Sequence, residues 1–347
     1  MKKRRRSNRR GTAVGLKEIA KSAGVSTATV SRVIHGNPHV KEELRQRVTD
    51  CIDRMAYRPN IAARSLRMRR TALVGVVLPT FSNPHFSDAL RAMQTVADAR
   101  GYTLLIASSD GDSEKTDNAL HSLLTRQVDG IILVPTARST SQMLDEVLKS
   151  GTPVVAMDRR VQSEPRIDHI TVNVRKGTSD AVRLLAKQGR KRIAFIAGPS
   201  NIWTASEKLS GYGDGIRAAG MKLDKDLILP GDYLLEGGAT QATELLKRKN
   251  RPDAVIVANN LMTLGAIRVL LRENIKMPRD IALIGFDDTD WTDVVRPTIS
   301  VIAQPVSSLG GAAMEQLLSR IDNKKKRRKA VDKVLPVELI LRESTNT

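Results

Sequence analysis

The sequence predicts a small all-α head of the helix-turn-helix type, followed by a larger α/β body with two doubly wound parallel sheets. Three observations support this fold class. Residues 16–34 have the pattern of two short helices joined by a tight turn. From Leu73 onward, apolar strand-like runs alternate with helical segments. Residues 1–70 carry 19 basic and 5 acidic side chains, and the basic run 324–329 supplies the rest of the net charge of +20.

Each helix expected within residues 16–34 has one apolar face. Gly24 supplies the turn, because a residue without a side chain takes a positive φ at little cost. Ser26 is a suitable N-cap for the second helix. The expected core residues are Ile19, Ala20, Ala23, Val30, Val33 and Ile34, closed by a third helix with Leu44, Val48, Ile52 and Met55.

The second helix leaves a set of small and basic side chains facing outward: Thr27, Ala28, Thr29, Ser31 and Arg32. A helix of this size and chemistry fits a DNA major groove, where arginine can fork onto guanine. A basic head on a near-neutral body is typical of a protein that binds a polyanion and has a separate second function. Charge that merely aids solubility is the alternative, but here the charge coincides with the helix-turn-helix.

The segment after the third helix is expected to be a linker. Tyr57 to Asn60 interrupts the helical pattern, and residues 61–67 are too short and too polar to form a stable helix alone. We expect this segment to become helical only when it is bound. The predicted divisions are a basic disordered arm (1–13), a helix-turn-helix domain (14–58), a linker (59–70), a body (71–342) and a tail (343–347).

In the body, strand-like runs are expected at 73–78, 103–107, 130–134, 153–157, 192–197, 254–258 and 281–285. Helices are expected at about 86–100, 114–126, 141–149, 176–188, 205–219, 237–248, 261–273 and 306–321. Such alternation favours parallel sheets covered on both faces, and the number of elements favours two lobes. A ligand is then expected at the carboxyl ends of the strands, in a cleft between the lobes.

Several other classes of protein are disfavoured. The single cysteine, Cys51, excludes a disulfide framework within one chain and is expected to be a buried apolar residue in a reducing compartment. There is no apolar run of membrane length, no signal peptide before the basic start, and no metal-ligand spacing among the five histidines. Nucleotide-loop and nucleophile motifs are absent. We therefore expect no enzyme, no cofactor, no metal and no membrane association.

A series of motifs, in order, resembles the lac-repressor/galactose-repressor (LacI/GalR) family of bacterial transcription regulators. In the head these are Ile19-Ala20, Ala23-Gly24-Val25-Ser26, Thr29–Val33, Tyr57–Asn60 and Ala63–Leu66. In the body they are Asp129–Ile132, Ala197–Pro199, Ala258-Asn259, Leu264–Ala266, Gly285–Asp288 and Gln304-Pro305. The resemblance covers residues 16–342 and implies a periplasmic-binding-protein-like body. We expect one lobe at about 71–160 and 291–323, and the other at about 161–290 and 330–342.

The resemblance also implies how the head binds DNA. Thr27, Ala28 and Arg32 correspond to base-reading positions, whereas Thr29, Ser31 and Asn60 are suited to the DNA backbone. The linker corresponds to the family's hinge helix, with Leu66 as a minor-groove wedge flanked by Ala63 and Arg67. A near-palindromic operator requires a two-fold protein, so a homodimer is expected.

For the effector, the resemblance implies cleft positions in both lobes: Asn83, Phe86, Asp158, Ser206, Asn259 and Asp287. We add the two tryptophans, Trp203 and Trp291, which are expected in loops facing the cleft, where either would stack on a ligand ring or simply pack half-buried. Asp and Asn side chains over an aromatic ring suit the hydroxyls of a sugar.

Three departures from the family pattern weaken a simple sugar assignment: Ser206 replaces a common arginine, Asn260 replaces an aspartate, and Asn173-Val174 replaces an Asp-Asn pair. Arg159, Arg160 and Lys208 would favour an acidic ligand, such as a sugar acid or a phosphorylated sugar. For each of these cations, however, a solvated surface position is the simpler interpretation.

We therefore predict a cytoplasmic, nucleoid-associated repressor whose operator affinity is controlled by a small molecule, a sugar or sugar acid. One alternative is a solute-binding protein, which would share the body but needs an export signal and no basic head. The other is a non-specific nucleoid protein, which would respond neither to DNA sequence nor to small ligands.

Overall fold

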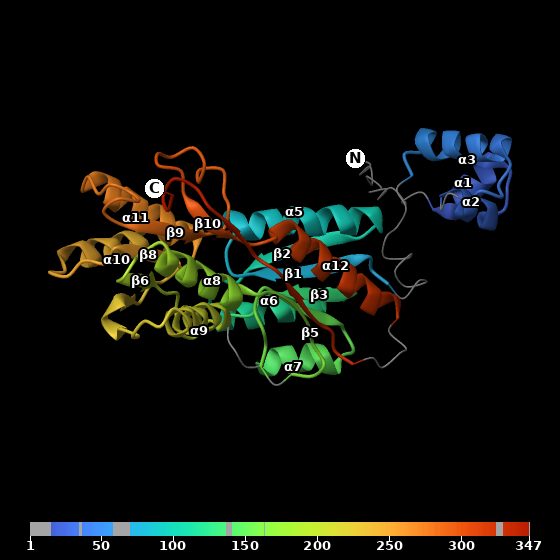
Figure 1. The fold of residues 1–347 in the computed structure, drawn as a ribbon. Helices are drawn as coiled ribbons and strands as arrows, with labels where there is room; N and C mark the ends of the chain where they lie inside the picture. The colour runs from blue at the N-terminus through green and yellow to red at the C-terminus, as the bar shows by residue number, and fades with distance from the viewer. Residues whose placement is uncertain are drawn as a thin grey trace, which may run out of the picture. The chain divides into compact units, whose positions relative to one another are not determined.

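A computed structural model describes residues 15–34, 37–57, 70–136, 141–162, 164–323 and 329–346. They belong to two compact units, Met1–Thr71 and Ala72–Thr347, which we call the head and the body and describe separately (Figure 1). The predicted arm at 1–13 and residues 59–69 of the predicted linker lie outside the described residues. No described helix is long and apolar enough to span a lipid bilayer.

Three helices build the head: α1 (Leu16–Ala23), α2 (Thr27–Ile34) and α3 (Glu42–Arg54). Gly24 ends α1 in the left-handed conformation, with φ of 64°, as predicted for the turn. The Ser26 hydroxyl accepts a hydrogen bond from the Thr29 backbone N–H at 3.1 Å, which caps α2. The core consists of Ile19, Ala20, Ala23, Val30, Val33, Val48 and Cys51, so Cys51 is buried as expected.

The first sheet of the body is entirely parallel, with strand order β11-β5-β4-β3-β1-β2. Its strands are β1 (Leu73–Leu78), β2 (Thr103–Ser108), β3 (Gly130–Leu133), β4 (Val154–Met157), β5 (Asp168–Val172) and β11 (Asp332–Leu335). Helices α5 (Pro84–Ala99) and α12 (Val306–Asp322) pack side by side on one face (Figure 1). Helices α6 (Ser113–Thr125) and α7 (Gln142–Lys149) cover the other.

The second sheet has the order β12-β10-β9-β8-β6-β7, and only β12 is antiparallel to its neighbour. Its strands are β6 (Ile193–Ile196), β7 (Ile228–Leu229), β8 (Ala254–Val257), β9 (Ala282–Phe286), β10 (Ser300–Ala303) and β12 (Glu338–Ile340). Helices α8 (Val174–Lys187) and α9 (Trp203–Ala218) pack as one pair, and α10 (Leu235–Lys247) and α11 (Asn260–Arg272) as the other. A 3-10 turn, η1, spans Lys225–Leu227.

All seven predicted strands and all eight predicted body helices are present, with ends that differ by at most two residues. Five strands were not predicted: β5, β7, β10, β11 and β12. They are short, and β5 begins with Asp168 and His169, while β11 is largely exposed. Periodicity identifies a strand poorly when it is this short or carries charged residues.

The predicted lobe boundaries are wrong in three places. Residues 168–172 and 332–335 belong to the first sheet, although we assigned them to the second lobe, and residues 300–303 belong to the second sheet, although we assigned them to the first. The cause is strand pairing across long sequence distances, which places β5 beside β4 and β10 beside β9. The chain therefore crosses between the lobes three times, after β5, β10 and β11.

The predicted tail is also wrong, because it is part of the second lobe. Ser344 and Thr345 are buried, at 0% and 2% exposure. The Ser344 hydroxyl donates to the Leu283 carbonyl at 2.7 Å, and the backbone N–H of Leu283 donates to the Ser344 carbonyl at 3.0 Å. These bonds attach the C-terminal segment to the backbone of β9.

A buried carboxylate connects the elements of the first lobe. Asp168, at the start of β5, accepts two hydrogen bonds of 2.6 Å from the Arg320 guanidinium and one of 2.6 Å from Gln316, both on α12. The backbone N–H of Val331, just before β11, donates to the same carboxylate at 2.8 Å. The Asp168 side chain is only 3% exposed, so these partners compensate for the burial of its carboxylate.

We expect Arg320→Met to lower the free energy of unfolding by about 3 kcal/mol, because it leaves a buried carboxylate without its cation. The matched control is Arg100→Met, which removes a longer ion pair with Asp322 of α12, at 3.9 Å and largely exposed; it should cost about 1 kcal/mol or less. Urea unfolding followed by circular dichroism measures both. Equal effects of the two substitutions would contradict a central role for Asp168.

Candidate functional site

The outer face of α2 carries the predicted base-reading residues. Thr27, Ala28 and Arg32 are all exposed there, on a helix whose opposite face is anchored by Val30 and Val33. Thr29 and Ser31 are half-buried. The Thr29 hydroxyl lies 3.0 Å from that of Ser26, so Thr29 helps to cap the helix. Asn60, Ala63, Leu66 and Arg67 lie outside the described residues.

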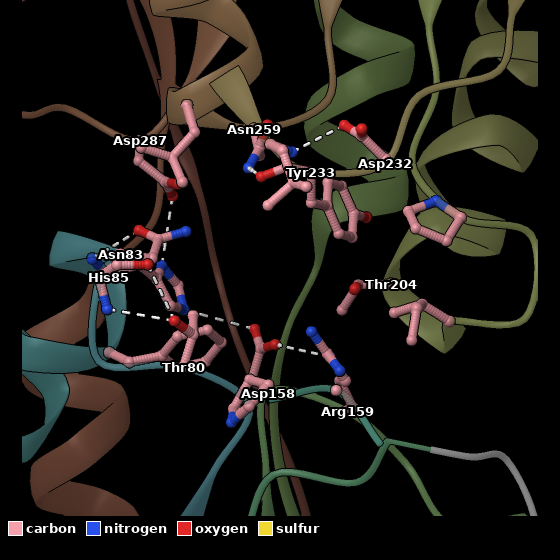
Figure 2. Close-up of a pocket in the computed structure, with 18 of the residues that line it drawn as sticks. Thr80, Asn83, His85, Asp158, Arg159, Thr204, Asp232, Tyr233, Asn259 and Asp287 are labelled. Atoms are coloured by element: carbon pink, nitrogen blue, oxygen red, sulfur yellow. Dashed lines mark hydrogen bonds and ion pairs between the residues drawn. The ribbon is translucent and has the colours of Figure 1, made fainter. Parts of the chain in front are cut away.

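The body contains a cleft of about 480 Å³ between its lobes. Its walls come from the carboxyl ends of parallel strands in both sheets, where the topology of doubly wound folds places ligand sites. The first lobe contributes the segments after β1, β2 and β4, and the second lobe those after β6, β7, β8, β9 and β10. Figure 2 shows ten of the lining residues by name. The volume falls within the range of small-molecule sites.

Five of the predicted effector residues line this cleft: Asn83, Phe86, Asp158, Asn259 and Asp287. Trp203, Ser206 and Trp291 do not line it. Trp203 is the first residue of α9 and stacks beneath the Arg160 guanidinium, 5.6 Å from the ring centroid. Ser206 lines a separate hollow, and Trp291 packs half-buried against the apolar core. The expectation that both tryptophans face the cleft is therefore wrong.

His85 lies between two carboxylates from different lobes (Figure 2). Its Nε2 is 3.5 Å from Oδ1 of Asp158, which follows β4, and its Nδ1 is 3.4 Å from Oδ1 of Asp287, which follows β9. All three side chains are buried, with at most 9% exposure. Asn83, the N-cap of α5, holds His85 in place by accepting its backbone N–H at 3.0 Å.

This arrangement keeps His85 protonated at neutral pH. Burial alone lowers the pKa of His85, but the nearby charges of Asp287 and Asp158 outweigh it, so the pKa rises to about 10. For Asp158 and Asp287, burial raises the pKa, yet the adjacent His85 imidazolium brings the pKa of both below the ordinary value. An ion triad therefore joins the two lobes.

A second link between the lobes runs through two amides. The Asn260 side chain, at the start of α11, donates to Oδ1 of Asn83 at 2.9 Å. Asn260 is 1% exposed, and it is one of the positions at which the sequence departs from the family resemblance. An uncharged amide can donate to Asn83, which an ionised carboxylate cannot do.

Two further cations line the cleft, Arg159 and Lys208, and both are buried at 7% and 5% exposure. The solvated positions that we considered simpler are therefore incorrect for them. Lys208 on α9 donates to the Ala258 carbonyl at 2.8 Å and lies 4.0 Å from the Phe286 ring centroid. Burial lowers the pKa of Lys208, and attraction to Asp287 and Asp158 opposes this shift.

Backbone conformation also distinguishes the cleft. Asp110, Asp158, Tyr233 and Asp287 all line it with positive φ, at 49°, 66°, 68° and 66°. Eight described non-glycine residues have a positive φ, and these four are among them. A positive φ is unfavourable for residues other than Gly, although Asn and Asp tolerate it better than most. Such strain concentrates at functional sites.

Sequence reasoning missed His85, Thr204, Tyr233 and Gln304, which also line the cleft. His85 was set aside because it has no metal-ligand spacing, and within the described residues no group of three or more His, Cys, Asp or Glu side chains is arranged to hold a metal ion. The available signal was its place at the start of the first helix after β1, two residues beyond Asn83.

We expect His85→Gln to lower the free energy of unfolding by about 3 kcal/mol near pH 6, because two buried carboxylates would lose the cation that lies between them. The stabilisation by His85 is complete below its ordinary pKa of 6.5 and is lost as the pH rises to its folded pKa of about 10. Urea unfolding at both ends of this range should show the difference shrinking. His121→Gln, an exposed site on α6, should match wild type throughout; a pH-independent effect of His85→Gln would contradict the charged triad.

Each of the two units, the head and the body, matches a known protein family model. Residues 15–60 match the family model described as bacterial regulatory proteins, lacI family. Residues 71–342 match the model described as periplasmic binding proteins and sugar binding domain of LacI family.

Individual relatives are similar over nearly their whole length. The catabolite control protein A of Priestia megaterium is 33% identical over 96% of this chain and 99% of that protein. The ribose operon repressor of Escherichia coli K12 is 32% identical over 88% of this chain and 92% of that protein. A crystal structure of the lac repressor dimer bound to operator and an anti-inducer has a TM-score of 0.83 and 26% identity, covering 97% and 100% of the two chains. The chain belongs to the LacI family of bacterial transcription regulators.

Proposed function

We propose that this regulator is a repressor that binds a near-palindromic operator as a homodimer and releases it when a small polyhydroxylated molecule, a sugar or sugar acid, occupies the cleft. The observation that carries this proposal is the cleft itself. Its polar walls come from two lobes that are joined by the His85 triad. A ligand that replaces or strengthens these contacts favours one lobe arrangement over another.

In this proposal each head reads a half-site with Thr27, Ala28 and Arg32, while Thr29, Ser31 and Asn60 contact the DNA backbone. The paired hinge segments, with Ala63, Leu66 and Arg67, fold into the central minor groove. Coupling between the sites is reciprocal, so a ligand that weakens operator binding is itself bound more weakly by the operator complex.

Within the cleft we assign effector contacts to Asn83, Phe86, Asp158 and Asp287. Asn259 has a supporting role, since its side chain already accepts from Met262 N–H and donates to the Tyr233 carbonyl, both at 3.0 Å. We propose a cytoplasmic, nucleoid-associated protein that catalyses no reaction. The relatives named above are regulators, which disfavours a solute-binding protein.

Selection of operator DNA from a random or genomic pool, followed by footprinting with a panel of sugars and sugar acids, tests the function. We expect a near-palindromic site whose occupancy changes with one compound. Asp287→Asn should keep operator binding and lose the response to that compound. Asp290→Asn, an exposed neighbour, should respond like wild type. A footprint that ignores both DNA sequence and every compound would favour the non-specific nucleoid protein.

For the head, we expect Arg32→Ala to weaken binding to the selected operator by roughly 10- to 100-fold and to relax specificity, because a base contact is worth about 1–3 kcal/mol. Arg47→Ala removes the same charge from the exposed surface of α3 and should weaken operator and unrelated DNA by the same factor. Fluorescence anisotropy at fixed salt measures both ratios. An unchanged specificity ratio for Arg32→Ala would exclude base reading by that residue.

A further inference from the structure

We infer that the effector is a polyhydroxylated anion, in which a carboxylate or phosphate group binds at Arg159 and Lys208 while a hydroxyl binds at Asp287. This inference rests on the proposed function, because it names the ligand class of the same cleft. It is carried by the burial of these side chains and by the hydrogen-bonding capacity that they leave unused.

The buried wall of the cleft is richer in cations than in carboxylates. Its charged side chains with less than one tenth exposure are three cationic residues and two acidic ones: His85, Arg159, Lys208, Asp158 and Asp287. His85 lies between the two carboxylates and pairs with both of them. Arg159 and Lys208 therefore have no acidic partner among these side chains that does not also pair with His85. The other acidic residues that line the cleft, Asp110 and Asp232, are exposed.

Arg159 is the strongest indication of an anion. Its guanidinium carries five donors, yet among the described residues it makes one hydrogen bond, from Nη1 to the Pro135 carbonyl at 3.1 Å. Its Nε is buried and has no hydrogen-bond partner among those residues, and it lies 3.6 Å from Oδ2 of Asp158. A buried guanidinium whose N–H groups lack acceptors destabilises the fold, unless a ligand supplies the missing acceptors. Carboxylate and phosphate groups match its donor geometry.

Lys208 adds donors on the second lobe. An ammonium group has three donors, and one of them is used by the Ala258 carbonyl at 2.8 Å. Burial lowers the pKa of Lys208, whereas an anion placed beside it would raise that pKa again. The charge of the ligand and the charge of Lys208 therefore support each other, which a neutral sugar does not achieve.

Asp287, on the same lobe as Lys208 and across the cleft from Arg159, provides an acceptor for a hydroxyl (Figure 2). Asp287 uses Oδ1 both for His85, at 3.4 Å, and for the Gln304 amide, at 2.6 Å. Its Oδ2 accepts no hydrogen bond from the described residues. A ligand hydroxyl that donates to Oδ2 would fill this unused acceptor position, so the ligand needs hydroxyl donors as well as an anionic acceptor group. A sugar acid and a sugar phosphate both meet this requirement, and the cleft of about 480 Å³ can hold either.

The test uses matched six-carbon probes with the full-length protein: gluconate, glucose 6-phosphate, glucose and sorbitol, with inorganic phosphate as the bare anion. Calorimetry at constant ionic strength should give at least tenfold tighter binding for one anionic sugar than for glucose or sorbitol, as expected for one hydrogen bond to a charged group. The preferred anion distinguishes a carboxylate from a phosphate. Inorganic phosphate, tested by differential scanning calorimetry, should raise the melting temperature of the protein.

Variants assign the effect to the cleft. Arg159→Gln should reduce binding of the anionic probe by tenfold or more, and Arg159→Lys, which keeps the charge, should lose less. Arg160→Gln is the matched control, because this neighbouring arginine pairs with Asp332 and Trp203 and does not line the cleft. Operator binding by each variant confirms that it is folded.

Three results would overturn the inference: glucose binding as tightly as both anions, full anion binding by Arg159→Gln, or no binding of any anionic probe at millimolar concentration. None of these affects the proposed function if the protein still selects an operator. Conversely, failure to select an operator would overturn the proposed function even if the anions bind.

Discussion

The contact on which the body depends most is the buried imidazolium of His85 between Asp158 and Asp287. Two buried carboxylates from separate lobes would repel each other, and the histidine between them converts that repulsion into an attraction. Because Asp158 and His85 belong to one lobe and Asp287 to the other, the attraction acts across the cleft. The arrangement of the lobes and the chemistry of the ligand site are therefore set by the same three side chains.

The neighbouring residues follow from this constraint. The backbone at Asp158 and Asp287, each the first residue after its strand, takes the left-handed conformation. Gln304 supports Asp287 from the start of the crossover into α12, and Asn260 and Asn83 add an uncharged link beside the triad. Each of these groups lies in a segment that follows a strand, so the positions of the strands in the two sheets largely determine the positions of these side chains.

The sequence predicted much of the fold because most elements have strong local signals. Long apolar runs such as Leu73–Leu78 identify buried parallel strands, and Gly24 and Ser26 identify the turn and cap in the head. The lobe boundaries were wrong because they depend on pairing between strands far apart in sequence, as for β5 with β11. Five cleft residues followed from motif positions. His85 did not, since its importance arises only when Asp158 and Asp287 are brought to it, and rarity alone was a poor guide for Trp203 and Trp291.

The three crossovers between the lobes have a consequence for how such a protein can be altered. No continuous stretch of the chain encodes either lobe, because each sheet takes strands from both the middle and the end of the sequence. A lobe therefore cannot be exchanged with that of a relative by a single recombination event, and a deletion near the C-terminus would damage both sheets. The head is one continuous segment. A single exchange at the boundary between head and body can therefore pair an operator specificity with a different effector site, whereas a change of effector within one body requires point substitutions in both lobes.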